Sequence, residues 1–188
     1  MKKHEINQTV VDDYDRYRQI QSEQKRITDP TFSLTKTETH PRNQSGDLPV
    51  SFSEMDETAH LNVDLNVEKT KSFKFRLFCD SFMEEPCYRF DSDGSTHENP
   101  TSPTRTLKQR IVPTPHFHCF DEQGRNIAYQ TESLKANQEA LMSNPGEAFK
   151  NFCEEENIRL DGEPEFLQET LPIGTSVLDD PLEGVEFP

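Results

Sequence analysis

The chain has 188 residues, a formal net charge of -15 and a mean hydropathy of -0.90, and only 31% of its residues are hydrophobic. This length accommodates one domain with appended segments, and the low hydrophobic fraction predicts that part of the chain lies outside the core. A chain this acidic repels phosphate backbones at long range, which argues against an ordinary nucleic-acid-binding domain.

The sequence contains no membrane segment and no disulfide pattern. No apolar run approaches the ~18–20 residues that span a bilayer, so we expect a cytoplasmic protein. The four cysteines are far apart without a C-x-x-C spacing. In a reducing compartment they are expected to be thiols that pack as small hydrophobic side chains.

The first 58 residues predict one helix followed by short strands. Residues 7–26 place apolar side chains at three- and four-residue spacings between charges, which indicates an amphipathic helix. Residues 28–58 mix turn-forming residues with short apolar pieces. One or two short strands are expected there, with a loop at 40–47.

The middle of the chain predicts β-structure. Residues 60–67 alternate apolar and polar side chains, and residues 71–79 place phenylalanine, leucine and cysteine on one face with Lys74 and Arg76 on the other. A third strand at 87–91 ends in a turn at Asp93-Gly94, residue types that tolerate positive φ.

A loop, a hairpin and two helices follow. Residues 99–115 are rich in proline, threonine and basic residues, which predicts a surface loop. Residues 116–120 and 125–130 form a predicted hairpin closed by a four-residue turn. A helix is expected over 134–142, and Asn144 is the predicted N-cap of another that packs through Ala148, Phe149, Phe152 and Cys153.

The last 28 residues form a predicted acidic tail. Residues 161–188 carry eight acidic side chains and no basic one, without a sustained apolar period. We therefore expect a single α+β domain over 1–160, with an antiparallel sheet of about five to seven strands, an N-terminal helix and C-terminal helices packed on one face, and an extended tail beyond it.

The predicted strands at 87–91 and 116–120 each carry polar side chains on one face, because side chains at i and i+2 of a strand point the same way. If both strands belong to one sheet, their polar side chains converge on one patch, and a four-residue turn would add Tyr129 opposite His116. The candidate catalytic residues are Arg89, Asp91, His97, His116 and His118. The candidate substrate-binding residues are Asn99, Arg105, Lys108, Arg110 and Tyr129.

Three interpretations of this patch stay open. A metal site would use His116 and His118 with His97 or Asp91, although H-x-H alone is a weak signal. A metal-independent ribonuclease site would use one histidine as base, another as acid, and Arg89 to stabilise the phosphorane. In the structural interpretation these side chains only tie two hairpins together by hydrogen bonds.

The chain resembles an uncharacterised bacterial family, domain of unknown function 6978. The resemblance rests on "YRFDSDGSTHENP", on "PTPHFHCF" and on "AFKNFCEEENI", and it spans roughly residues 14–158. It implies that Arg89, Asp91, Gly94, His97, Asn99, His116 and His118 form the family's polar signature. It also implies a bacterial setting at mobile or defence-associated loci, without supplying a reaction.

The sequence therefore favours a component of a prokaryotic conflict system, either toxin–antitoxin or phage defence, with an endoribonuclease-like site that needs no metal or other cofactor. His116 or His118 would be the general base, His97 the general acid, and Arg89 the phosphate clamp oriented by Asp91. RNA is the expected substrate. The alternative is a non-catalytic protein that docks its acidic tail, residues 161–188, onto a basic protein partner as an inhibitor or accessory subunit.

Overall fold

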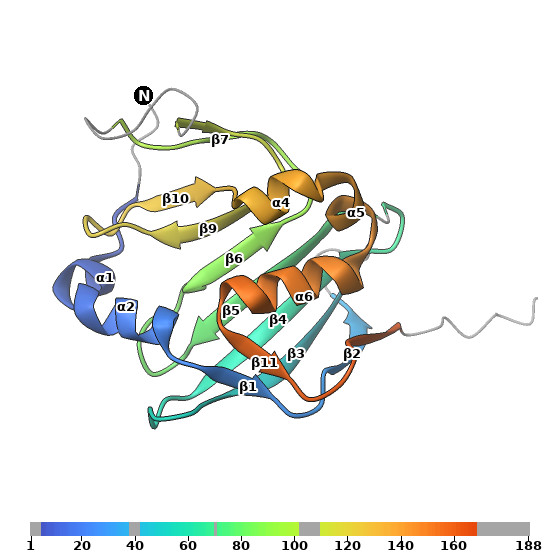
Figure 1. The fold of residues 1–188 in the computed structure, drawn as a ribbon, viewed down its shortest axis with the longest axis horizontal. Coiled ribbons are helices and arrows are strands. Elements are labelled where there is room, and N and C mark those ends of the chain that lie inside the picture. Colours follow the sequence, from blue (N-terminus) through green and yellow to red (C-terminus); the bar gives the residue numbers. More distant parts are fainter. Residues whose placement is uncertain (1–4, 38–41, 70, 102–109, 169–188) are drawn as a thin grey trace, which may run out of the picture.

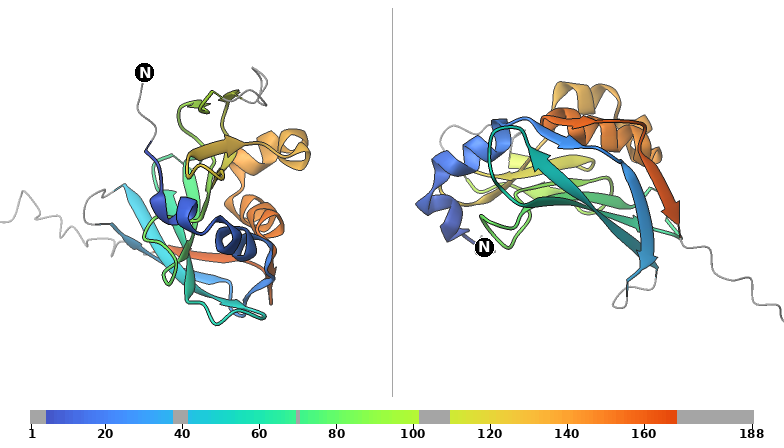
Figure 2. Two further views of the ribbon diagram at one scale, coloured as in Figure 1. Left: turned by 90° about the vertical axis from the view of Figure 1, so that its left-hand side faces the viewer. Right: turned by 90° about the horizontal axis from the view of Figure 1, so that it is seen from below.

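The computed structural model describes residues 5–37, 42–69, 71–101 and 110–168. The fold is α+β, as predicted: a curled, mostly antiparallel sheet carries helices on one side (Figures 1 and 2). The helices are α1 (Gln8–Asp12), α2 (Tyr14–Ser22), α4 (Glu132–Ala136), α5 (Gln138–Ser143) and α6 (Pro145–Glu155). The strands are β1 (Lys25–Ile27), β2 (Thr31–Lys36), β3 (Asn43–Phe52), β4 (Ala59–Asn66), β5 (Phe73–Cys79), β6 (Tyr88–Asp91), β7 (His97–Glu98), β8 (Ile111–Val112), β9 (His116–Phe120), β10 (Asn126–Tyr129), β11 (Ile158–Leu160) and β12 (Glu165–Gln168).

The main sheet follows the order β10-β9-β6-β5-β4-β3-β1-β11, and β2 joins β3 and β12. It has ten strands within the described residues rather than the five to seven expected, because short strands from both ends of the chain extend it. Pairing is antiparallel except where β11 meets β1 and β12 meets β2. The strands β7 and β8 form a separate two-stranded ribbon.

The core lies between the sheet and α6. In β4 and β5 buried and half-buried residues alternate without a break, as the sequence predicted. The ring of Phe75 lies 5.3 Å from that of Phe149 and 5.9 Å from that of Phe152 on α6. Burying each phenylalanine contributes roughly 1.5–3 kcal/mol. The side chain of Asn144 accepts hydrogen bonds from the first turn of α6, so the predicted N-cap is confirmed.

The N-terminal helix is shorter than predicted and is broken. The backbone of Asp13 leaves the helical region, and its side chain accepts a hydrogen bond from the Arg16 N–H, so Asp13 ends α1 and caps α2. The helix then stops at Ser22 because residues 25–27 pair with β3 and β11.

Two further predictions were wrong. The expected loop at 40–47 is largely strand, since β3 begins at Asn43 and pairs with β4 along eight residues. The expected boundary after Leu160 falls inside the fold, because β12 pairs with β2 and Phe166 stacks on Phe32 at 5.3 Å. The acidic residues beyond Gln168 lie outside the described residues.

The cysteines follow the sequence expectation. All four are free thiols, and Cys79, Cys87 and Cys153 are buried. Among the residues that the structure describes, no helix is long and apolar enough to cross a membrane.

Candidate functional site

The R-x-D and H-x-H segments lie on adjacent strands, as the site prediction required. In the β6–β9 pair Arg89 is directly opposite His118, and Asp91 is opposite His116. Their neighbours Phe90 and Phe117 pack in the core. The polar side chains therefore point to the side of the sheet opposite α6: Arg89, Asp91 and the two histidines. We call this side the outer face.

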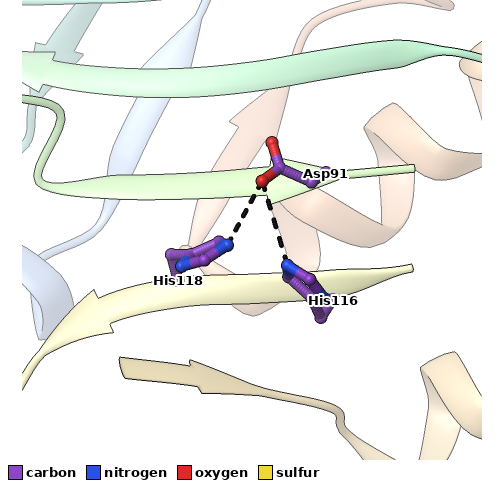
Figure 3. Close-up of side chains that lie close together, drawn as sticks. All are labelled: Asp91, His116 and His118. Carbon is purple, nitrogen blue, oxygen red and sulfur yellow. Dashed lines mark ion pairs between the residues drawn. The ribbon is translucent and has the colours of Figure 1, made fainter. Parts of the chain in front are cut away.

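Asp91, His116 and His118 form a tight buried cluster on this face (Figure 3). The Oδ2 atom of Asp91 lies 3.2 Å from Nε2 of His118 and 3.8 Å from Nε2 of His116. Each histidine is only 2% exposed and Asp91 is 8% exposed. Among the described residues, Asp91 Oδ1 is buried and has no hydrogen-bond partner.

The hydrogen-bond partners of each imidazole ring indicate which of its nitrogens carries the proton. Nδ1 of His116 lies 3.1 Å from the carbonyl oxygen of Pro113, which can only accept, so Nδ1 donates. Nε2 of His118 lies 2.9 Å from Nη2 of Arg89, which can only donate, so this Nε2 accepts. Nδ1 of His118 then donates to Oδ1 of Asn126 at 2.8 Å.

The electrostatics agree with a neutral His116 beside an ionised Asp91 carboxylate. Burial, and next the neighbouring His118, lower the pKa of His116 to about 4. Burial alone would raise the pKa of Asp91, but the adjacent His118 and the charges of Arg89 and Lys74 together lower it to about 2.

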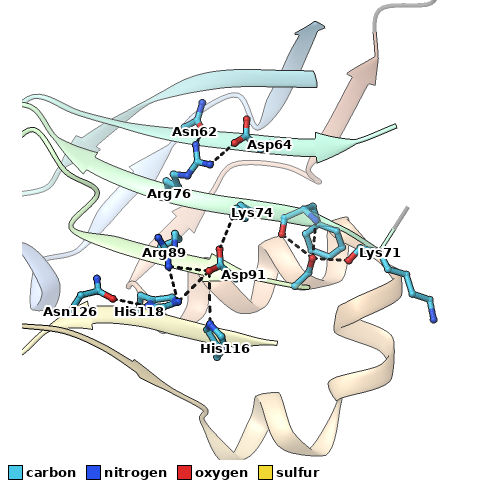
Figure 4. A network of polar contacts seen from close by, with 12 residues as sticks. Asn62, Asp64, Lys71, Lys74, Arg76, Arg89, Asp91, His116, His118 and Asn126 are labelled. Atoms are coloured by element: carbon cyan, nitrogen blue, oxygen red, sulfur yellow. Dashed lines mark hydrogen bonds and ion pairs between the residues drawn. The ribbon is translucent and has the colours of Figure 1, made fainter. Parts of the chain in front are cut away.

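Cationic side chains extend the polar network across the outer face (Figure 4). Arg89 contacts Asp91 Oδ2 at 3.1 Å, and its side chain is 34% exposed. On β5, Lys74 lies 4.0 Å from Asp91 Oδ1, and Arg76 pairs with Asp64 at 2.5 Å. Arg89 is therefore the cation that reaches both the carboxylate and an imidazole of the cluster.

His97 joins the cluster from the β7–β8 ribbon. Its ring centroid lies 4.8 Å from that of His118 and 6.2 Å from that of His116. The predicted grouping of three histidines is therefore present, although the two on β9 are the ones that face Asp91.

Asn99 was predicted to bind substrate, but it has a structural contact. Its side chain is 3% exposed, accepts a 2.7 Å hydrogen bond from the Ala128 N–H and donates one of 2.7 Å to the Ala128 carbonyl. Asn99 thus pairs with the open edge of β10 as another strand would.

Tyr129 does not belong to the site. The β9–β10 connection has one residue more than predicted, so Ala128 lies opposite His118 and Tyr129 opposite Phe117. Tyr129 therefore points into the core, and its hydroxyl donates to Glu155 at 2.9 Å. Gly124, with φ of +66°, accommodates this longer turn.

The predicted basic cluster is only partly described. Arg105 and Lys108 lie outside the described residues. Arg110 pairs with Glu98 across the β7–β8 ribbon at 2.7 Å, so the structure gives it a partner other than the histidine cluster.

A pocket of about 340 Å³ adjoins the cluster and was not predicted. Arg89, His118 and Asn126 form one wall, and the chain before α1, including Glu5 and Asn7, forms another. No sequence pattern indicated Asn126 as a site residue. The alternation of β10 would have placed it beside His118 only with the correct turn length.

The comparisons leave the chain without an assigned family. No family model, curated protein or solved structure matches it. The resemblance to domain of unknown function 6978 therefore stays a prediction.

Proposed function

We propose that the chain is an enzyme that cleaves RNA at the Arg89–Asp91–His116–His118 cluster. The observation that carries the proposal is the strand register, which places an anion-binding guanidinium beside two imidazoles, with Arg89 and His118 lining a pocket. Phosphoryl-transfer sites need these parts: a cation for the transferring phosphate and a group that activates the attacking oxygen.

The reaction would be attack of a ribose 2′-hydroxyl on the adjacent phosphorus. The O2′–P bond forms and the P–O5′ bond breaks, which leaves a 2′,3′-cyclic phosphate and a 5′-hydroxyl. The activating group takes the proton of the 2′-hydroxyl, and an acid, for which His97 is the candidate, supplies one to the leaving 5′-oxygen. Arg89, which lines the pocket with a partly exposed side chain, would hold the phosphate.

RNA cleavage by the purified protein tests this proposal. We expect Arg89→Met and His118→Gln to lower the cleavage rate by roughly 100-fold or more, the usual scale of acid–base and electrostatic contributions. His60→Ala is the matched control, because His60 pairs with Asp80 at 2.9 Å elsewhere on the sheet. No cleavage of any RNA, or equal loss in His60→Ala, would contradict the proposal.

A place in a prokaryotic conflict system and a cytoplasmic location are proposals that the sequence resemblance and composition support. Docking of an acidic tail on a basic protein is the alternative proposal, supported by the eight acidic and no basic residues of 161–188. This alternative predicts that a basic protein binds the chain at low salt and dissociates at high salt or when residues 169–188 are removed. It also predicts that the purified chain does not cleave RNA.

A further inference from the structure

We propose that Asp91, His116 and His118 bind one divalent first-row transition-metal ion, with zinc as the simplest occupant. The residue pattern in the sequence favours a site without metal. The geometry of the three side chains points the other way, and it does so whether or not the substrate is RNA.

Three possible metal-ligand atoms converge in one buried place. The Nε2 atoms of His116 and His118 are acceptors, because the Pro113 carbonyl and the Arg89 guanidinium fix the two tautomers. Both face the carboxylate oxygen of Asp91, which is also an acceptor. Three acceptors in one buried place repel each other unless a cation lies among them.

The distances between the three ligand atoms also fit a metal ion. The three candidate ligand atoms all lie within 4.8 Å of one another, and the two separations from Asp91 Oδ2 are 3.2 and 3.8 Å. With metal–ligand bonds of about 2.0–2.2 Å, tetrahedral ligands are separated by about 3.3–3.6 Å. An ion therefore fits after small side-chain rotations.

The hydrogen bonds at the Nδ1 atoms of the two histidines also fit a metal site. Histidines that bind metals donate their other ring N–H to an oxygen, which fixes the tautomer and the ring orientation. His116 has the Pro113 carbonyl in this role, and His118 has Asn126. Asp91 Oδ1 is buried without a hydrogen-bond partner among the described residues, and Lys74 Nζ lies 4.0 Å from it, so this second carboxylate oxygen has no close donor there.

Arg89 holds the place of the ion in this structure. Its Nη2 atom lies 2.9 Å from Nε2 of His118 and 3.1 Å from Oδ2 of Asp91, so one positive group bridges two of the three acceptors. The Arg89 side chain is 34% exposed and borders the pocket, so it has room to withdraw toward solvent. An ion would then keep open positions on the pocket side for water or substrate.

The donor set limits which metals fit. Two imidazole nitrogens and one carboxylate suit Zn²⁺, Fe²⁺, Mn²⁺ or Co²⁺, whereas Mg²⁺ and Ca²⁺ prefer oxygen ligands and Cu⁺ prefers sulfur. With Zn²⁺ bound, the ion would lower the pKa of a bound water, and the resulting hydroxide would replace the imidazole lone pair as the activating group.

Zinc binding to the EDTA-treated, dialysed full chain tests the proposal by titration calorimetry, without RNA. We expect one Zn²⁺ per chain, and visible d–d absorption of a nitrogen–oxygen site when Co²⁺ replaces it. His116→Gln, His118→Gln and Asp91→Asn should each weaken zinc binding at least 100-fold, and Asn126→Ala 10- to 100-fold. His60→Ala should bind as the wild type does.

Arg89→Met separates this proposal from the structural interpretation and from RNA cleavage. If the guanidinium holds the place of the ion, Arg89→Met should bind Zn²⁺ as tightly as the wild type or more tightly, while RNA cleavage falls. Weaker zinc binding in Arg89→Met would overturn the proposal. So would wild-type protein that gives no Co²⁺ spectrum and no stoichiometric heat, a result that does not depend on whether any variant folds. Wild-type protein that binds zinc but cleaves no RNA would refute only the proposed reaction.

Discussion

Replacing Asn99 by alanine should destabilise the fold without changing the chemistry of the site. Asn99 makes two hydrogen bonds of 2.7 Å with the backbone of Ala128, which is 2% exposed. The alanine variant leaves a buried N–H and a buried carbonyl unpaired, and each costs roughly 1–3 kcal/mol. We therefore expect the free energy of unfolding to fall by about 3 kcal/mol and the Tm to fall by roughly 6–12 °C.

Urea unfolding and thermal melting measure this effect. Asn62→Ala is the matched control, because the half-buried Asn62 amide donates to Ser45 and Asp47 and accepts from Arg76 on the outer face of the sheet, where water can replace the lost contacts. We expect that control to lose less than about 1 kcal/mol. RNA cleavage and zinc binding by Asn99→Ala, assayed well below its Tm, should be close to wild type. Unchanged stability with lost cleavage would refute this reasoning and restore Asn99 to the substrate-binding role that the sequence suggested.

Three other predictions concern the fold. Gly124→Ala should lower the free energy of unfolding by about 2 kcal/mol or more in urea titrations, because φ is +66° and an added Cβ would lie 2.3 Å from the Asn7 carbonyl. Burial raises the pKa of Glu156 well above 4.5, so this carboxyl's stabilising contribution is full below pH 4.5 and is lost as pH rises. Glu156→Gln should therefore flatten the decline in stability above about pH 5, and an unchanged pH profile in urea would contradict this. Ending the chain after Leu160 should lower the Tm because β12 is lost from β2, whereas ending it after Gln168 should not. Equal melting temperatures would refute the extended domain boundary.

Alternation along the strands predicted which side chains of β6 and β9 share a face. In β6 and β9, apolar residues at every second position identify the core face, so the side chains of Arg89, Asp91, His116 and His118 had to share the other face. The pairing of the two strands was only a condition, because nothing local in either strand specifies its neighbour. Once that condition was met, the grouping followed from the pleat alone.

The errors arose where one residue or one distant contact decides the outcome. The placement of Tyr129 depended on turn length, and a single extra residue before β10 moved it to the core face. Lys25 lies within the range predicted as an amphipathic helix, yet it is fully buried and its Nζ donates to the carbonyls of Gln21, Glu23 and Glu156. One of these acceptors lies 131 residues away, and no local pattern encodes such a contact.

The structural interpretation of the histidine cluster accounts for only part of its contacts. Arg89 does tie β6 to β9, since it donates to His118 and pairs with Asp91. A tie that served stability alone would also satisfy the remaining buried polar atoms, because each unpaired one costs free energy. Asp91 Oδ1 instead has no hydrogen-bond partner in the described part of the chain, where it has only the Lys74 ammonium at 4.0 Å, and the acceptor Nε2 of His116 faces a carboxylate at 3.8 Å.

Such conflicts between local groups are typical of functional sites, where the arrangement suits a ligand rather than the empty fold. A bound metal ion is one chemical resolution of this conflict that serves all three side chains at once. A positive ion among the two nitrogens and the carboxylate would turn their mutual repulsion into coordination, and it would release Arg89 toward the pocket. The same three side chains would then hold the ion and leave the guanidinium free to bind an anionic substrate.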